Sequence, residues 1–156
     1  MNTLLIYPKF PDTYCIFKHA LSFQGKRAAQ PPRGLMTIAA LLPASWPKRL
    51  IDTNVDRLRD SDLEWADVAM ISGMHVQHAH LIAIVERCRA RGLRTVVGGP
   101  ITSSVPASVR KADHIVIGEA ETLMVDLVHD LTVNRALTVY QAPERPAMLI
   151  SPLSDL

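Results

Sequence analysis

The sequence contains few cysteines and few aromatic residues. Its two cysteines, Cys15 and Cys88, stand far apart in no C-x-x-C spacing, which excludes a zinc knuckle or an iron–sulfur ligand set, so we expect free thiols. Aromatic residues make up 5% of the chain. No apolar run approaches the roughly 18–20 residues of a membrane span, and the N-terminus resembles no signal peptide. We therefore expect a cytoplasmic protein with no membrane partner.

An excess of charge of one sign is also missing. The formal net charge is +2, and the basic residues are scattered rather than gathered in a stripe with aromatic residues. This pattern does not favour a nucleic-acid partner. What the chain does have is aliphatic side chains, with 48% hydrophobic residues over 156 positions. That length and composition indicate one globular domain with an aliphatic core.

Short runs rich in Val, Ile and Leu recur along the chain. They are continuous rather than alternating, which is typical of strands covered on both faces. The runs are residues 3–8, 48–54, 67–73, 94–99 and 114–119, with helical patterns at 34–43, 79–92 and 119–132. This alternation predicts a Rossmann-like or flavodoxin-like α/β fold. Its doubly wound parallel sheet of about five strands would form a three-layer αβα sandwich.

Two segments depart from this alternation. Residues 9–33 form an unusually long connection, and loops of that length tend to be functional or disordered. From Leu137 onward the chain carries three prolines and no helical period. We therefore expect one domain over residues 1–136, and an extended tail or linker over residues 137–156 that leads toward a further C-terminal domain.

Small residues gather where the predicted strands end. In an open parallel sheet, ligands bind outside the carboxyl ends of the strands. A glycine there lets a ligand approach the backbone closely, although tight turns explain any single glycine equally well. The clustering at one edge favours a bulky ligand. The residues at these ends are Pro8, Asn54, Ser72, Gly73, Met74, Gly98, Gly99, Pro100, Gly118 and Glu119.

Several familiar sites are absent. No G-x-G-x-x-G follows the first strand and no P-loop occurs, which disfavours NAD, FAD and P-loop nucleotide binding. His75, His78 and His80 have no carboxylate nearby in sequence to complete a metal set, and no Ser or Cys partner is visible for catalysis. We assign neither a metal ligand nor a catalytic residue. Glu119 and Glu121 stand beside a helix start, where capping is the simplest role.

The remaining motifs are similar to those of a known family. Ser72-x-Met74 after the third strand and Gly98-Gly99 after the fourth resemble the S-x-L and G-G motifs of cobalamin-binding domains. With "PPRGLMTIAALLP", "LIDTNV", "WADVAMISGMHVQ", "VVGGPIT" and "ADHIVIGEAET", the chain resembles the N-terminal cobalamin-binding domain of cobalamin-dependent radical S-adenosylmethionine enzymes. The resemblance covers nearly the whole chain, and the order and spacing of the motifs make it specific.

The resemblance implies a mode of binding. The corrin of cobalamin would lie over the carboxyl edge of the sheet, and the nucleotide tail would enter between sheet and helices. Gly98 and Gly99 would leave room for this tail, and the Ser72 hydroxyl would bond its buried heterocycle. The expected cofactor-binding residues are Ser72, Gly73, Met74, His75, Gln77, Gly98, Gly99, Pro100, Gly118 and Glu119.

Two departures from the family's patterns limit the expected role. The stretch "YPKFPDTYCIFKH" contains no D-x-H-x-x-G, so we expect cobalamin bound base-off with no protein histidine on cobalt, and the loop 9–33 beside the corrin. The chain also lacks C-x-x-x-C-x-x-C. The 4Fe-4S cluster, S-adenosylmethionine and methyl transfer would therefore belong to a C-terminal radical domain, and this chain alone would not be catalytic.

Two alternatives stay open. The first is a degenerate domain of the same fold that has lost cobalamin and serves as a docking or structural module. The second is a small α/β enzyme or nucleotide-binding protein that uses Glu119, Glu121 and the histidines. Binding tests with cobalamin or with a nucleotide separate these alternatives.

Overall fold

A six-stranded parallel sheet forms the centre of the molecule. The computed structural model describes residues 1–11 and 31–142, so most of the predicted loop 9–33 lies outside the described residues. The strands are β1 (Thr3–Tyr7), β2 (Lys48–Asp52), β3 (Val68–Ser72), β4 (Arg94–Gly98), β5 (His114–Ile117) and β6 (Val139–Gln141). They pair in the order β2-β1-β3-β4-β5-β6. The predicted α/β fold class is confirmed, and each of the five apolar runs contains a strand.

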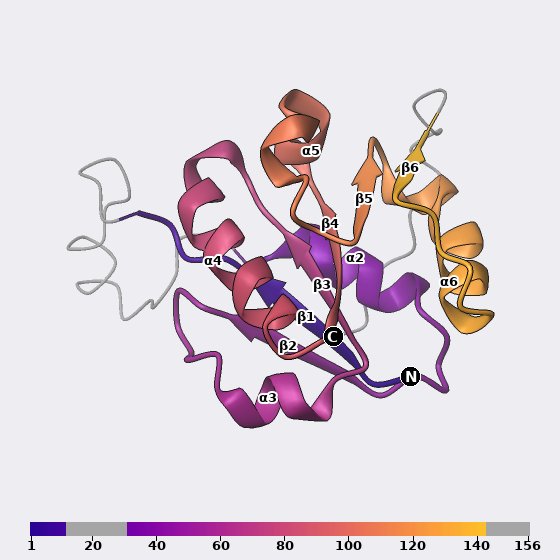
Figure 1. The fold of residues 1–156 in the computed structure, drawn as a ribbon, viewed down its shortest axis with the longest axis horizontal. Helices are drawn as coiled ribbons and strands as arrows, with labels where there is room; N and C mark the ends of the chain where they lie inside the picture. Colours follow the sequence, from indigo (N-terminus) through magenta and orange to yellow (C-terminus); the bar gives the residue numbers. More distant parts are fainter. Residues whose placement is uncertain (12–30, 143–156) are drawn as a thin grey trace.

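Helices cover both faces of this sheet (Figure 1). They are α2 (Arg33–Leu41), α3 (Asp60–Trp65), α4 (His78–Arg89), α5 (Pro100–Ser104) and α6 (Met124–Thr132), with 3-10 turns η2 (His75–Gln77), η3 (Pro106–Val109) and η4 (Ala120–Thr122). The helices α2 and α6 pack on one face, and α3, α4 and α5 pack on the other. This is the expected three-layer arrangement. The short α3 and α5 were not predicted, because neither is long enough to show a helical period.

Each face has its own apolar core. On one face Leu81, Val85 and Cys88 of α4 are fully buried against the sheet. Burial raises the pKa of the Cys88 thiol to about 11, so that it stays protonated at neutral pH. Helix α4 ends three residues before the predicted end, and Gly92 follows it at a φ of 68°, which is the left-handed conformation expected of a glycine after a helix.

The sixth strand corrects the predicted tail. The sequence indicated an extended linker from residue 137, but Val139–Gln141 pairs in parallel with β5, with Tyr140 beside Val116. Tyr140 is 5% exposed, and its hydroxyl donates to Asp130 Oδ2 at 2.8 Å and accepts from the Leu137 backbone N–H at 2.9 Å. Residues 139–141 therefore belong to the sheet. A strand of three residues is too short for its pattern to be recognised.

No helix within residues 1–11 and 31–142 combines the length and the apolar character that crossing a membrane requires.

Replacing Tyr140 with Phe tests whether β6 is part of the domain. The change removes the bond to Asp130 and leaves the Leu137 N–H without its acceptor, so we expect the free energy of unfolding to fall by about 1 kcal/mol. Urea denaturation followed by circular dichroism measures the change. Val139→Thr, at an exposed position of the same strand, is the control. An unchanged stability in Tyr140→Phe would show that β6 is detached in solution.

Candidate functional site: two joined cavities at the carboxyl edge of the sheet

Three neighbouring strands share one side-chain pattern on the face covered by α2 and α6. Met70, Val96 and Val116 are buried there, and the residue two positions later in each chain segment is small. Side chains two apart in a strand point to the same face. The three buried residues therefore form an apolar floor, and the three small residues after them form a rim with little side-chain volume. The rim residues are Ser72, Gly98 and Gly118.

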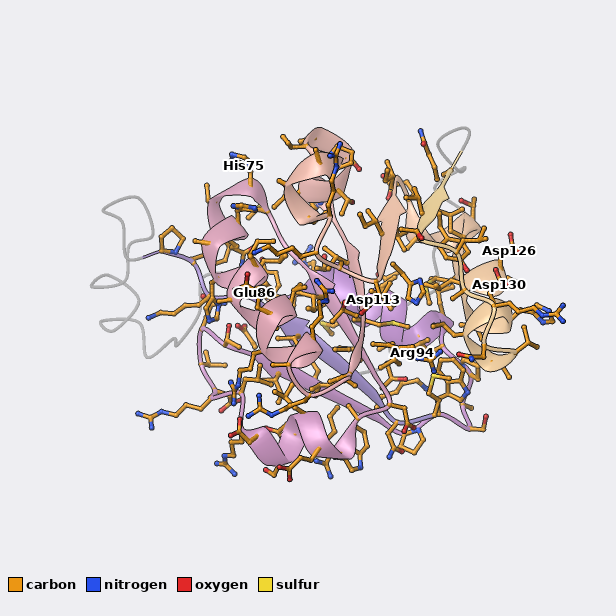
Figure 2. All side chains as sticks on the ribbon, in the orientation of Figure 1. His75, Glu86, Arg94, Asp113, Asp126 and Asp130 are labelled. Atoms are coloured by element: carbon orange, nitrogen blue, oxygen red, sulfur yellow. The ribbon has the colours of Figure 1, made fainter. Side chains whose placement is uncertain are left out.

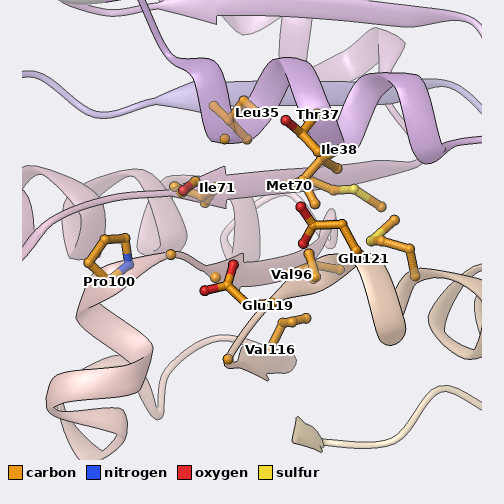
Figure 3. A pocket seen from close by; sticks show the side chains of 17 residues that line it. Leu35, Thr37, Ile38, Met70, Ile71, Val96, Pro100, Val116, Glu119 and Glu121 are labelled. Carbon is orange, nitrogen blue, oxygen red and sulfur yellow. The ribbon is translucent and has the colours of Figure 1, made fainter. Parts of the chain in front are cut away.

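A cavity of about 230 Å³, here called the inner groove, lies between this face and the helices (Figure 3). Helix α2 contributes one wall, and the segment from η4 to α6 contributes another. Most of the side chains that face it are apolar. The lining residues are Gly34, Leu35, Thr37, Ile38, Met70, Ile71, Ser72, Val96, Gly98, Gly99, Pro100, Val116, Gly118, Glu119, Ala120, Glu121 and Met124.

A second cavity of about 490 Å³, here called the edge cavity, lies over the ends of the strands. Its lining residues are Tyr7, Pro31, Pro32, Arg33, Gly34, Leu35, Ser72, Gly73, Met74 and Pro100. Gly34, Leu35, Ser72 and Pro100 line both cavities, so the two spaces meet at these residues. A broad space over the sheet edge thus continues into a narrower apolar space beneath α2.

The Ser72 side chain stands at this junction. Its hydroxyl has no hydrogen-bond partner within residues 1–11 and 31–142, although it can both donate and accept. Across the junction, a Cβ built on Gly34 would lie 3.9 Å from Ser72 Oγ, so the first turn of α2 approaches the hydroxyl closely. Ser72 was predicted from its place at the end of a strand. Gly34 was missed as a site residue, although "PPRG" before the helical pattern marked a special helix start.

The two adjacent glycines after β4 have different roles. A Cβ on Gly98 would make ordinary contacts with Val116, at 3.6 Å from its Cβ, and Gly98 lines the inner groove. Gly99 has a φ of 92°, and a Cβ there would lie 2.5 Å from Ser72 Oγ and 3.2 Å from the Gly73 backbone nitrogen. Gly98 therefore keeps the groove open. Gly99 lines the groove too, but the space beside it is already filled by Ser72 and Gly73.

The segment after β3 contributes both lining residues and a buried residue behind the lining of the edge cavity. Gly73 and Met74, two of the predicted cofactor-binding residues, line that cavity. Gln77 lines neither cavity and is 1% exposed. Its amide accepts from the Met74 backbone N–H at 2.8 Å and donates to the Pro8 carbonyl oxygen. Gln77 thus ties the end of β1 to the segment after β3, a supporting position rather than a lining one.

His75 is exposed and lies outside both cavities, at the outer end of the α4 segment (Figure 2). Its ring stacks on His78, with centroids 6.4 Å apart. His80 Nδ1 accepts from the Lys9 backbone N–H at 2.8 Å, and burial, followed by the charge of Lys9, lowers the pKa of His80. The described part of the chain holds no cluster of three side chains able to bind a metal ion.

The segment after β5 brings two carboxylates to the inner groove. Gly118 turns the chain there at a φ of 95°, and both Glu119 and Glu121 line the groove. Glu119 is the N-cap of η4 but its side chain makes no capping hydrogen bond, so the capping role expected from the sequence is wrong for this residue. Tyr7 was also missed. It ends β1 in the edge cavity, and burial raises its pKa.

Comparison with known proteins identifies a family match over the part of the chain that forms the inner groove. The family model described as B12 binding domain matches residues 28–128. The chain is 34% identical over 155 residues to the uncharacterized methyltransferase sll1242 of Synechocystis sp., and 31% identical over 155 residues to the hopanoid C-2 methylase of Rhodopseudomonas palustris. These alignments cover 98% and 96% of this chain but only 29% of each relative. No solved structure matches the chain significantly.

The matched segment begins before α2 and ends within α6, so it contains every element that lines the inner groove. It also includes Ser72, Gly98 and Gly118, the three small residues at the rim. The resemblance to cobalamin-binding domains that the motifs indicated is thereby confirmed. The chain belongs to the B12-binding domain family.

Proposed function

We propose that this chain is the cofactor-holding module of a cobalamin-dependent radical S-adenosylmethionine methyltransferase. The observation that carries the proposal is the meeting of a broad edge cavity and an apolar inner groove at the unpaired Ser72 hydroxyl. Cobalamin has the matching parts, a wide corrin and a nucleotide tail that ends in a flat heterocycle. When bound, it supplies a cobalt centre that accepts and donates a methyl group.

The described residues fit both parts of this cofactor. The corrin would lie in the edge cavity against Tyr7, Met74 and Pro100. The tail would enter past Gly98 into the inner groove. A benzimidazole removed from water needs a partner for its ring nitrogen, and the Ser72 hydroxyl supplies a donor at the groove entrance.

The proposed binding mode is base-off and His-off. A base seated in the inner groove is removed from the cobalt, which would lie over the strand ends. His75, His78 and His80 line neither cavity, which supports a lower face without a histidine from this segment. The sequence also lacks the D-x-H-x-x-G motif that provides such a ligand in other cobalamin domains.

Methyl transfer itself is proposed for a longer protein that contains this module. The two curated relatives carry the printed names of a methyltransferase and a methylase, and this chain spans about 29% of their length. We propose that S-adenosylmethionine and an iron–sulfur cluster bind in the remaining part of such a protein. The residues described above then hold and orient cobalamin without taking part in bond breaking.

Binding of hydroxocobalamin is the direct test. We expect the purified chain to retain the cofactor through gel filtration and to show the visible spectrum of base-off cobalamin in the protein peak. Free hydroxocobalamin run on the same column is the control. A colourless protein peak would contradict the proposal and favour the alternative of a docking domain that has lost its cofactor.

A graded series at Gly98 tests the groove. Gly98→Ala and Gly98→Val place first one and then three carbon atoms in the groove, while the contact with Val116 stays ordinary. We expect the Kd for cobalamin to rise with side-chain size, by roughly tenfold or more for Val, because overpacking costs about 1–3 kcal/mol. Absorbance titration measures the Kd. Equal affinities across the series would place the tail elsewhere.

A substitution at Gly99 should lower the stability of the domain. A side chain at Gly99 adopts a strained positive φ and meets Ser72 Oγ, so we expect Gly99→Ala to lower the free energy of unfolding by about 1–3 kcal/mol. Gly98→Ala is the matched control and should unfold close to the wild type. Urea denaturation of both variants without cofactor makes the comparison. A Gly99→Ala variant as stable as the control would contradict the role assigned to Gly99.

A further inference from the structure

Glu121 is a charged side chain in a mostly apolar cavity, and its chemistry suggests what it contacts. We infer that Glu121 accepts hydrogen bonds from the ribose hydroxyl groups of the nucleotide tail, and so makes the domain select corrinoids that carry a complete tail. This inference rests on the proposed function. It adds a selectivity that neither the family match nor the names of the relatives assign.

The position of Glu121 places its carboxylate inside the groove. Residue 121 lies within η4, which packs against α2. Figure 3 shows its side chain extending from η4 toward α2, with Thr37 and Ile38 above the carboxylate and Val96 below it. The side chain therefore reaches from η4 into the groove toward α2.

Glu121 lies in the first turn of η4 and already has an interaction within the protein. Glu121 is inside the 3-10 turn rather than at its N-cap, and α6 begins at Met124 with Leu123 as its N-cap. A carboxylate in a mostly apolar cavity is costly unless hydrogen-bond donors face it. It offers about four acceptor sites on two oxygens, so a ligand can be bound in addition to a protein partner.

The chemistry of the tail indicates which of its groups would donate to the remaining acceptor sites of Glu121. A dimethylbenzimidazole ring detached from cobalt offers a nitrogen acceptor and no N–H donor, so it suits Ser72 and not Glu121. The phosphodiester is an anion and would be repelled by a carboxylate. The ribose between them carries hydroxyl donors. An alcohol donor facing a carboxylate forms a charge-assisted hydrogen bond, which is stronger than one between neutral groups.

Glu119 provides a matched comparison two residues away. It also lines the inner groove, but it is exposed and lies at the carboxyl edge beside Gly118. In Figure 3 its carboxylate points toward the end of the groove at Pro100 rather than toward α2. From there it would face the amide groups at the corrin periphery. Those amides are present whether or not the corrinoid carries a nucleotide tail.

The experiment compares two corrinoids with two variants of the full chain. Hydroxocobalamin carries the nucleotide tail, and cobinamide has the same corrin amides without it. We expect Glu121→Gln to raise the Kd for hydroxocobalamin about tenfold, since a hydrogen bond to a charged group is lost or weakened, and to leave the Kd for cobinamide unchanged. Glu119→Gln should change both Kd values by the same factor.

Each contrary outcome has a defined meaning. A Glu121→Gln variant that lost affinity for both corrinoids equally, or bound hydroxocobalamin more tightly, would overturn the inference while leaving cobalamin binding in place. Unfolding curves of the variants without cofactor show whether the fold is kept. Glu121→Ala repeats the binding test with a side chain that cannot form a hydrogen bond, unlike the amide of Glu121→Gln. A wild-type chain that bound neither corrinoid would overturn the proposed function, and the inference with it.

Discussion

The site depends on a close approach of three backbone segments around the Ser72 hydroxyl. The chain after β4, the first turn of α2 and the end of β3 meet there, and two of the three contribute a glycine. With a Cβ on Gly99 the Ser72 side chain would have to move, and Gly34 keeps the facing turn of α2 open. This absence of side chains leaves a hydroxyl without a partner among residues 1–11 and 31–142, at the junction of two cavities. Ser72 is only half-buried, so its hydroxyl stays accessible from the cavities and can still donate and accept a hydrogen bond.

The parallel sheet explains why the cavities lie where they do. Parallel strands bring all their carboxyl ends to one edge, and the order β2-β1-β3-β4-β5-β6 reverses direction at β1, between the connections to β2 and to β3. Helices α2 and α6 lie on the same face on either side of this region. The groove between them is floored by Met70, Val96 and Val116, while the small residues at the strand ends open it to the edge. The fold therefore provides a broad space and a narrow one together.

Much of this arrangement was predictable from the sequence, because it depends on local patterns. Continuous apolar runs identified five of the six strands, and the rule for parallel sheets led to Ser72, Gly98 and Gly118 at the strand ends. The missed features depend on packing between distant segments. The role of Gly99 follows from the position of an oxygen atom on another strand. Gln77, a predicted cofactor-binding residue, lines neither cavity, because the turn η2 directs its side chain toward Pro8.

Gln77 has a further consequence for the energetics of binding. Its buried amide joins Pro8, which follows β1, to Met74 after β3, and Met74 lines the edge cavity. A floor already held by hydrogen bonds loses little conformational entropy when a ligand is placed on it. The edge cavity is in this sense preorganised, so that more of the contact energy of a ligand placed there would appear as affinity. A single uncharged side chain that lines neither cavity would thereby affect how tightly such a ligand is held.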